Sequence, residues 1–343
     1  MLSGVVGHEK VKKVLLSSYL DGRVGHAYIF EGPKGVGRLT AAKAFSKLLL
    51  CENPNSGEPC GICKSCSMCE SGNHPDLAVV TNQLYDQSKK STDVLVDTIR
   101  NMKKDVFIKP YVSERKIYIV PKADTMNVYA QNSLLKVLEE PPAYCTIILI
   151  AENPNMFLPT VLSRTVSIKF FPLSDENVEE YLRNNYPQMS DSAVAVAAMS
   201  AGSIGKAKML CESSETLKLR DELLAVFEAL LNNKKRVIYD FALFLKRNKD
   251  DFEILRDILQ GLFCDLLYIK KSGDFEQIIN PDKISKLGEI GGQIYESVPQ
   301  KMLEILLKYN EYFSKNISYA QIAQCMSLEL WEAIHDRSYR SEI

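Results

Sequence analysis

The sequence predicts an α/β domain built on a parallel sheet, followed by a chain that is helical throughout. In the first half, short β-rich runs alternate with segments of helical periodicity, which is typical of a parallel sheet covered by helices. The β-rich runs stop near residue 170, and beyond that point apolar residues recur at helical spacing. A chain of 343 residues is long enough for two or three such cores.

The expected strands are short apolar runs bounded by turn residues. They are Ala27–Glu31, Leu77–Thr81, Lys116–Val120, Thr146–Ala151 and Val166–Phe170. Helices are expected between them over Asp93–Lys104 and Asn127–Glu139. The second helix must end at Glu140-Pro141-Pro142, because proline cannot continue a helix.

Three domains are expected, without an internal repeat. The α/β domain covers residues 1–170. Ser174-Asp175-Glu176 then indicates a helix start, with a polar cap and an acidic first turn. A small helical domain is expected over residues 171–212 and a larger C-terminal helical domain over residues 213–343.

Composition limits the class of protein. Hydrophobic residues make up 46% of the chain and charged residues 25%, as in a soluble globular protein. A net charge of -1 argues against a protein that mainly coats nucleic acid. The start MLSGVVGHEK carries no apolar run, and stretches such as Thr146–Ala151 are too short to cross a bilayer. We therefore expect a cytoplasmic protein without a membrane partner.

A glycine-rich loop follows the first expected strand. Its glycines are Gly32, Gly35 and Gly37, and a helical pattern begins after it. In a P-loop, such glycines let backbone N–H groups surround phosphates, a Lys neutralises the phosphates and a Ser or Thr holds magnesium. Here Arg38 and Leu39 occupy the Lys and hydroxyl positions. The loop predicts a phosphate-binding fold that lacks the side chains for hydrolysis.

The end of the expected strand Lys116–Val120 is also unusual for a P-loop ATPase. That strand normally ends in acids that organise magnesium and water. Here Pro121-Lys122-Ala123-Asp124 follows, and a cation at Lys122 would oppose a metal ion. Asp124 is expected to cap a helix that begins near Thr125. The alternative is an active or slow ATPase, in which Arg38 replaces the Lys and Asp124 recruits the metal.

A cysteine cluster follows the helix after the glycine-rich loop. The pattern C-x8-C-x2-C-x2-C is formed by Cys51, Cys60, Cys63 and Cys66. Four thiolates at such short spacings favour a tetrahedral structural zinc site. Cys69 and His74 lie nearby as alternative ligands, and free or redox-active thiols are the other interpretation. The insertion of about residues 51–72 would either stabilise itself or contact a partner.

Four segments together resemble the bacterial clamp-loader AAA+ family, and within it the delta-prime class of DNA polymerase III subunit. They are Gly25-His26-Ala27-Tyr28, the four-cysteine insertion, the run from Gln131 to Pro142, and the run from Leu158 to Arg164. The resemblance covers roughly residues 1–210. It implies an AAA+ core, a small helical lid and a C-terminal helical collar that joins subunits.

The resemblance also shows where this chain departs from the hydrolysing motor subunits. Ala151-Glu152 stands where motor subunits usually have Thr after the fourth strand. Gly202-Ser203-Ile204-Gly205 stands where they have a Gly-Ser-x-Arg sensor, although Lys206 follows. With the changes at Arg38 and Lys122, four parts of one catalytic site are altered. ATP or ADP is therefore expected not to be hydrolysed, and its binding is doubtful; a regulator that holds nucleotide without turnover is the other alternative.

The segment Ser163-Arg164 keeps the family pattern, apart from Thr165 in place of Cys. In the family this arginine completes the ATP site of a neighbouring motor subunit. The resemblance thus implies a trans-acting role for Arg164, with motor (tau/gamma-type) and delta subunits as partners, and contact with the sliding clamp and primer-template DNA through the assembly. Arg100, with Lys103 and Lys104, is a candidate DNA contact, although such charges also occur on solvated helix faces.

Overall fold

The computed structural model describes residues 2, 4–86, 91, 93–187, 193–212, 214–231, 234–271, 278–313 and 318–335. It separates into two compact units. The N-terminal unit comprises Met1–Tyr181 and Gly202–Gly205, and the C-terminal unit comprises Leu182–Ala201 and Lys206–Ile343. Ser213, the expected first residue of the last domain, lies outside the described residues.

The first part of the chain alternates strands and helices as expected. Its elements are α1 (Glu9–Leu20), β1 (Ala27–Glu31), α2 (Arg38–Leu50), α3 (Lys64–Ser71), β2 (Leu77–Val79), α4 (Asn82–Tyr85), α5 (Val96–Val106), β3 (Lys116–Val120), η1 (Ala123–Thr125), α6 (Val128–Glu139), β4 (Cys145–Ala151), η2 (Pro154–Met156), α7 (Pro159–Leu162), β5 (Val166–Lys169) and α8 (Asp175–Asn185).

All five strands form one parallel sheet in the order β2-β3-β4-β1-β5. The inner strands β1, β3 and β4 are buried along their whole length, whereas the edge strands β2 and β5 are partly exposed. Apolar runs that are buried on both faces are typical of inner parallel strands. The predicted parallel α/β core is confirmed.

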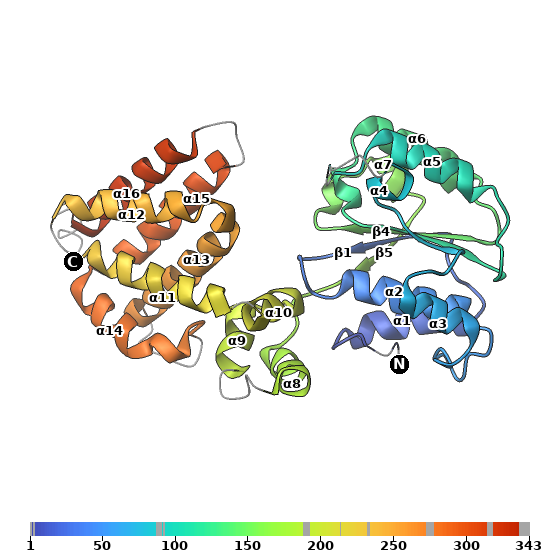
Figure 1. Ribbon diagram of the computed structural model, residues 1–343, viewed down its shortest axis with the longest axis horizontal. Helices are drawn as coiled ribbons and strands as arrows, with labels where there is room; N and C mark the ends of the chain where they lie inside the picture. Colours follow the sequence, from blue (N-terminus) through green and yellow to red (C-terminus); the bar gives the residue numbers. More distant parts are fainter. Residues whose placement is uncertain are drawn as a thin grey trace. The chain divides into compact units, whose positions relative to one another are not determined.

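Helices cover both faces of the sheet (Figure 1). Ile29 of β1 packs in the core cluster that includes Ile99 of α5 and Leu134 of α6. The next residue, Phe30, packs in the opposite cluster, which includes Leu15 of α1 and Phe45 of α2. This alternation follows from the period-two side-chain direction of a strand. The parallel pairing places the carboxyl ends of β1, β3 and β4 along one edge, where the glycine-rich loop emerges.

After α8 the described chain is helical, as the sequence predicts. The elements are α9 (Ala193–Ser200), α10 (Ile204–Glu212), α11 (Ser214–Ala229), α12 (Arg236–Arg247), η4 (Lys249–Asp251), α13 (Phe252–Lys271), η5 (Pro281–Lys283), α14 (Ile284–Gln293), α15 (Val298–Phe313) and α16 (Tyr319–His335). None of the described helices is both long and apolar enough to cross a membrane.

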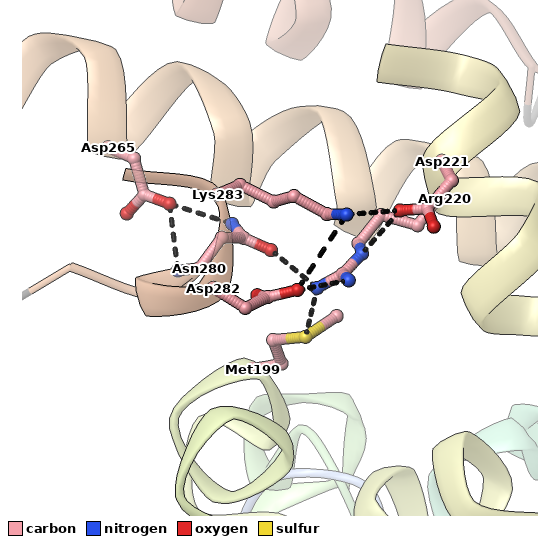
Figure 2. Close-up of polar contacts among 7 residues, drawn as sticks. All are labelled: Met199, Arg220, Asp221, Asp265, Asn280, Asp282 and Lys283. Carbon is pink, nitrogen blue, oxygen red and sulfur yellow. Dashed lines mark hydrogen bonds and ion pairs between the residues drawn. The ribbon is translucent and has the colours of Figure 1, made fainter. Parts of the chain in front are cut away.

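A buried polar network joins α9 to the longer helices of the C-terminal unit (Figure 2). Arg220 of α11 is 5% exposed, and it bonds both carboxylate oxygens of Asp282 at 3.1 and 2.6 Å. The same guanidinium lies 3.1 Å from the sulfur of Met199 on α9. Asp265 of α13 accepts the backbone N–H groups of Ile279 and Asn280 at 2.7 and 2.9 Å. These contacts fix the segment before α14 against three helices.

Candidate functional site

The glycine-rich loop connects β1 to α2 and packs closely against the segment Gly202–Gly205. Gly35 has a φ of +78°, and a Cβ placed there would lie 2.2 Å from the Ser203 hydroxyl oxygen. Ser203 Oγ donates to the Lys34 carbonyl at 3.1 Å. The Gly205 N–H donates to the Gly35 carbonyl at 2.9 Å. Only glycine at position 35 allows this approach.

Arg38 begins α2, and its side chain turns inward. It is 7% exposed. Its guanidinium donates to the carbonyl of Ala151 and lies 3.5 Å from the carboxylate of Glu152. Burial lowers the pKa of the Arg38 guanidinium, and the carboxylates of Glu152 and Asp124 oppose that change. Two departures from the motor pattern, at position 38 and at the end of β4, therefore form one mutual contact.

Asp124 has a different role from the one predicted. Its carboxylate oxygen Oδ2 accepts the backbone N–H groups of Glu152 and Asn153, at 2.9 and 3.0 Å. The expectation that it caps a helix is wrong, because a 3₁₀ turn occupies Ala123–Thr125 and Asn127 caps α6. Asp124 instead ties the end of β3 to the end of β4.

Arg164 follows α7, and a buried glutamine of α6 holds the segment before α7. Gln131 is 2% exposed. Its amide nitrogen donates to the carbonyls of Met126 and Met156 at 2.9 and 3.0 Å. Its oxygen accepts the N–H of Leu158 at 2.8 Å. One side chain thus fixes α7, and with it the origin of Arg164, relative to α6.

The Arg164 side chain lies at the surface, 36% exposed. Its Nη1 donates to the Thr160 carbonyl at 3.0 Å and to the Ser163 hydroxyl at 3.1 Å. Its Nη2 lies 3.1 Å from the carboxylate of Glu139, the last residue of α6. All of these partners are themselves near solvent. A guanidinium held this way is accessible to an anion, unlike that of Arg38.

The four predicted cysteines come together. The sulfurs of Cys51, Cys60, Cys63 and Cys66 all lie within 4.8 Å of one another. Two of the separations from Cys51 are 3.6 Å to Cys60 and 4.0 Å to Cys63. A tetrahedral zinc with Zn–S bonds of about 2.3 Å requires sulfurs about 3.8 Å apart. The cluster therefore fits a structural zinc ion.

Backbone N–H groups point at several of these sulfurs. The N–H of Cys60 lies 3.2 Å from Cys51 Sγ, and that of Cys66 lies 3.3 Å from Cys63 Sγ. N–H groups of Ile62 and Cys63 lower the pKa of the Cys60 thiol to about 6, which favours the thiolate form that binds metal. Burial raises the pKa of Cys66. Metal binding would displace that proton.

The two alternative ligands lie outside the cluster that the described residues form. Burial raises the pKa of Cys69 to about 11, and its sulfur does not belong to the group of four sulfurs. His74 instead accepts the Asp76 N–H at Nδ1, at 3.1 Å, and its Nε2 lies 3.3 Å from Ser113 Oγ. Both ring nitrogens are therefore occupied, one by the Asp76 N–H and the other by Ser113 after α5.

Arg100 lies on the exposed side of α5, where it pairs with Asp97 at 3.5 Å. With Lys103, Lys104 and Lys136 it lines an open hollow of about 810 Å³. Acids, including Asp97, line the same hollow. The structure thus brings the three predicted cations together and adds a fourth from α6, a set that suits phosphate contact.

Sequence reasoning did not identify Glu139 and Glu152 as arginine partners. Glu139 was part of the family motif, but nothing local connects it with a residue 25 positions later. In the sequence, Glu152 is only part of the Ala151-Glu152 departure from the motor pattern. A signal existed for this second contact, because a new cation at position 38 and a new acid at position 152 are complementary charges.

Comparisons with known proteins show which family this chain resembles. The family model described as "DNA polymerase III, delta subunit" matches residues 7–174. The DNA polymerase III subunit delta' of Bacillus subtilis is 30% identical over 298 residues, which are 86% of this chain and 84% of that protein. The subunit tau of the same organism is 27% identical over 330 residues, which cover 90% of this chain but only 57% of tau.

Among solved structures, a DNA polymerase III gamma-subunit-related protein from Thermotoga maritima aligns over 95% of this chain and 99% of its own, with 14% identity and a TM-score of 0.47. The alignment with the delta' relative covers most of both chains, and the family model spans the sheet and the glycine-rich loop. The chain therefore belongs to the family of DNA polymerase III delta-prime and related clamp-loader subunits.

Proposed function

We propose that this chain is a delta-prime-like clamp-loader subunit that does not hydrolyse ATP and that donates Arg164 to the ATP site of a neighbouring motor subunit. It would assemble with motor and delta subunits through its C-terminal helices, acting as a collar. The assembly would load a sliding clamp on primed DNA. The observation that carries this proposal is the pairing of Arg38 with the end of β4.

The Arg38 contact supports the loss of hydrolysis. A phosphate-binding cation must face the bound nucleotide, whereas this guanidinium is buried against Ala151 and Glu152. Asp124 is the residue that would recruit magnesium in an active site. One of its carboxylate oxygens accepts hydrogen bonds from two backbone N–H groups. The loop also packs against Ser203 and Gly205. These residues do not fit a hydrolysing nucleotide site.

The rival function is an active motor-type ATPase, which the tau relative makes worth testing. Steady-state hydrolysis and equilibrium binding of ATP and ADP on the purified chain separate the possibilities. We expect neither binding nor hydrolysis. Binding without turnover would support a nucleotide-holding regulator, and turnover would support the motor type.

The trans-acting role is tested by Arg164→Ala in the reconstituted assembly. An arginine that stabilises transition-state charge is worth about 10³–10⁵ in rate at the site it serves. We expect the complex to assemble normally and its DNA-stimulated ATPase to fall, with the loss confined to one site. Arg183→Ala, a charge removed from α8, serves as the control. Unchanged turnover with Arg164→Ala would refute the role.

The cysteine cluster would hold zinc with Cys51, Cys60, Cys63 and Cys66 as ligands. With four protein ligands no coordination position is open, so the ion would be structural.

Direct DNA contact would come from the hollow that Arg100 lines. Arg100→Ala should lower the salt dependence of DNA binding by the assembly by about one phosphate contact, measured as the slope of log K against log salt.

A further inference from the structure

The guanidinium of Arg164, although partly exposed, is paired within its own chain in this structure. Its two terminal nitrogens contact Thr160, Ser163 and Glu139 within the same chain, at 3.0 to 3.1 Å. Three contacts of this kind hold the guanidinium along α7 and against the end of α6. To serve a neighbouring site, the side chain must leave at least the carboxylate, because one guanidinium edge cannot face Glu139 and a phosphate together.

Glu139 is well placed for this contact. It is the last residue of α6, where the helix dipole disfavours a negative charge, so a nearby cation stabilises it. Gln131 on the same helix fixes the segment before α7. The spacing between the Glu139 carboxylate and the origin of Arg164 is therefore set by one rigid element.

We propose that Glu139 is a positioning residue that holds Arg164 in a retracted position, so that Arg164 engages only when a neighbouring subunit presents a phosphate in exchange for this carboxylate. The inference rests on the proposed trans role of Arg164. The Glu139 side chain is 50% exposed, and pairs this open to solvent shift an equilibrium by up to about fivefold. A charge-assisted guanidinium–phosphate pair is stronger, so the retracted state delays engagement without preventing it.

The test is Glu139→Gln in the reconstituted assembly, with ATP as the probe. The substitution keeps the shape of the side chain and removes its charge. We expect the apparent KM for ATP to fall by about two- to fivefold while kcat changes by less than about twofold, because the released arginine is engaged in both proteins once ATP is bound. A merely structural role would not produce this split.

Glu140→Gln is the matched control. Glu140 is the adjacent residue and also exposed, and the described residues give it no ion pair. The Glu140→Gln substitution removes one negative charge from the same helix end as Glu139→Gln. Equal effects of the two variants would reduce the inference to a general charge effect and overturn it. Wild-type behaviour of Glu139→Gln would also overturn it.

A double-mutant cycle separates this inference from the proposed function. In an Arg164→Ala background, Glu139→Gln should have no effect, and a persisting effect would refute the pairing. If Arg164→Ala alone leaves turnover unchanged, the trans role fails. If Arg164→Ala lowers turnover and Glu139→Gln behaves as wild type, only the Glu139 inference fails. Should Glu139→Gln not assemble, Glu139→Asp keeps the charge and shortens the reach, and a wild-type KM for it would count against the pairing.

Discussion

Arg38 and Arg164 belong to the same N-terminal unit, yet their guanidinium groups have different surroundings. Arg38 is 7% exposed and bonds the main chain at the end of β4. Arg164 is 36% exposed and bonds a carboxylate and a hydroxyl that solvent also reaches. Burial of a charge is tolerated only where the fold supplies partners, so Arg38 has been incorporated into the core.

Under the proposed function, this difference in burial corresponds to different tasks for the two arginines. A buried arginine with fixed partners contributes to stability and cannot bind an external anion. A surface arginine with weak partners contributes little to stability and remains available to an anion. In this chain the arginine of the glycine-rich loop is held in the core, whereas the arginine proposed to meet a phosphate lies at the surface near the end of α6.

Removal of zinc should have the largest effect on stability among these predictions. It should leave the proposed function of Arg164 unchanged. The cluster begins at Cys51, directly after the helix that starts with Arg38. Structural zinc sites bind with about 10–16 kcal/mol, so chelation should unfold the insertion of residues 51–72. We expect new protease cleavage there, one zinc per chain before chelation, and unchanged ATPase stimulation through Arg164.

Cysteine variants provide the control for the zinc prediction. Cys60→Ser should lose the metal, whereas Cys69→Ser, in the same insertion but outside the cluster, should retain it. Metal content measured by elemental analysis decides between them. Loss of zinc from Cys69→Ser, with retention in Cys60→Ser, would mean that the ligand set is wrong.

Gln131→Ala should destabilise the region that carries Arg164. It removes a side chain that satisfies three buried or partly buried backbone groups, so we expect a loss of about 2–4 kcal/mol in the free energy of unfolding. The segment before α7 should also loosen, which lowers trans stimulation. Denaturant unfolding and the assembly ATPase measure the two effects. Asn132→Ala, an exposed amide on the same helix, should change stability by less than about 0.5 kcal/mol.

Arg38→Met should destabilise the region around Arg38. It keeps most of the packing and leaves Glu152 without its cation, while the Ala151 carbonyl keeps a bond from the Gly32 N–H at 3.2 Å. We expect a loss of about 1–3 kcal/mol in the free energy of unfolding and no change in assembly ATPase. Lys43→Met on the exposed side of α2 is the control. An ATPase loss as large as that of Arg164→Ala would abolish the distinction between the two arginines.

Much of the fold could be predicted because its signals are local. The apolar runs of β1 and β3 have the predicted bounds, and the four cysteines converge because their spacing along the chain is short. The Arg38 contact could not be predicted from spacing, since its partner lies 113 residues away and is a main-chain carbonyl. A sequence shows which side chains are charged but not which distant backbone groups will face them.

The error at Asp124 has the same physical origin. An acid before a helical pattern is most simply explained as a local cap. In the fold, the ends of β3 and β4 are neighbours, and the carboxylate reaches across to two N–H groups of the adjacent strand end instead. Asn127 takes the capping position. The Asp124 carboxylate is thus used by a tertiary contact and not by a local cap.

The smallest expected effect concerns His8, the residue before α1, which contacts the glycine-rich loop. Its Nε2 lies 2.8 Å from the carbonyl of Val36, within the loop, and its ring meets Phe170 edge-on at 4.9 Å. Burial lowers the pKa of His8 below its usual 6.5, Lys12 lowers it further, and the Val36 carbonyl and Glu9 oppose this. The folded chain therefore prefers the neutral imidazole.

The sign of the pH dependence follows from proton binding. Between the lowered folded pKa and 6.5, the unfolded chain binds more protons at this residue than the folded chain, so stability rises with pH. The contribution is complete above about pH 6.5 and is lost as the pH falls through the folded pKa. His8→Gln retains a donor for Val36 but does not titrate, and thermal unfolding from pH 5.5 to 7.5 should be flatter for this variant than for wild type. Both proteins keep the zinc cluster and His74, so the difference reports His8 alone. Equal slopes would mean that folding does not lower the pKa of His8.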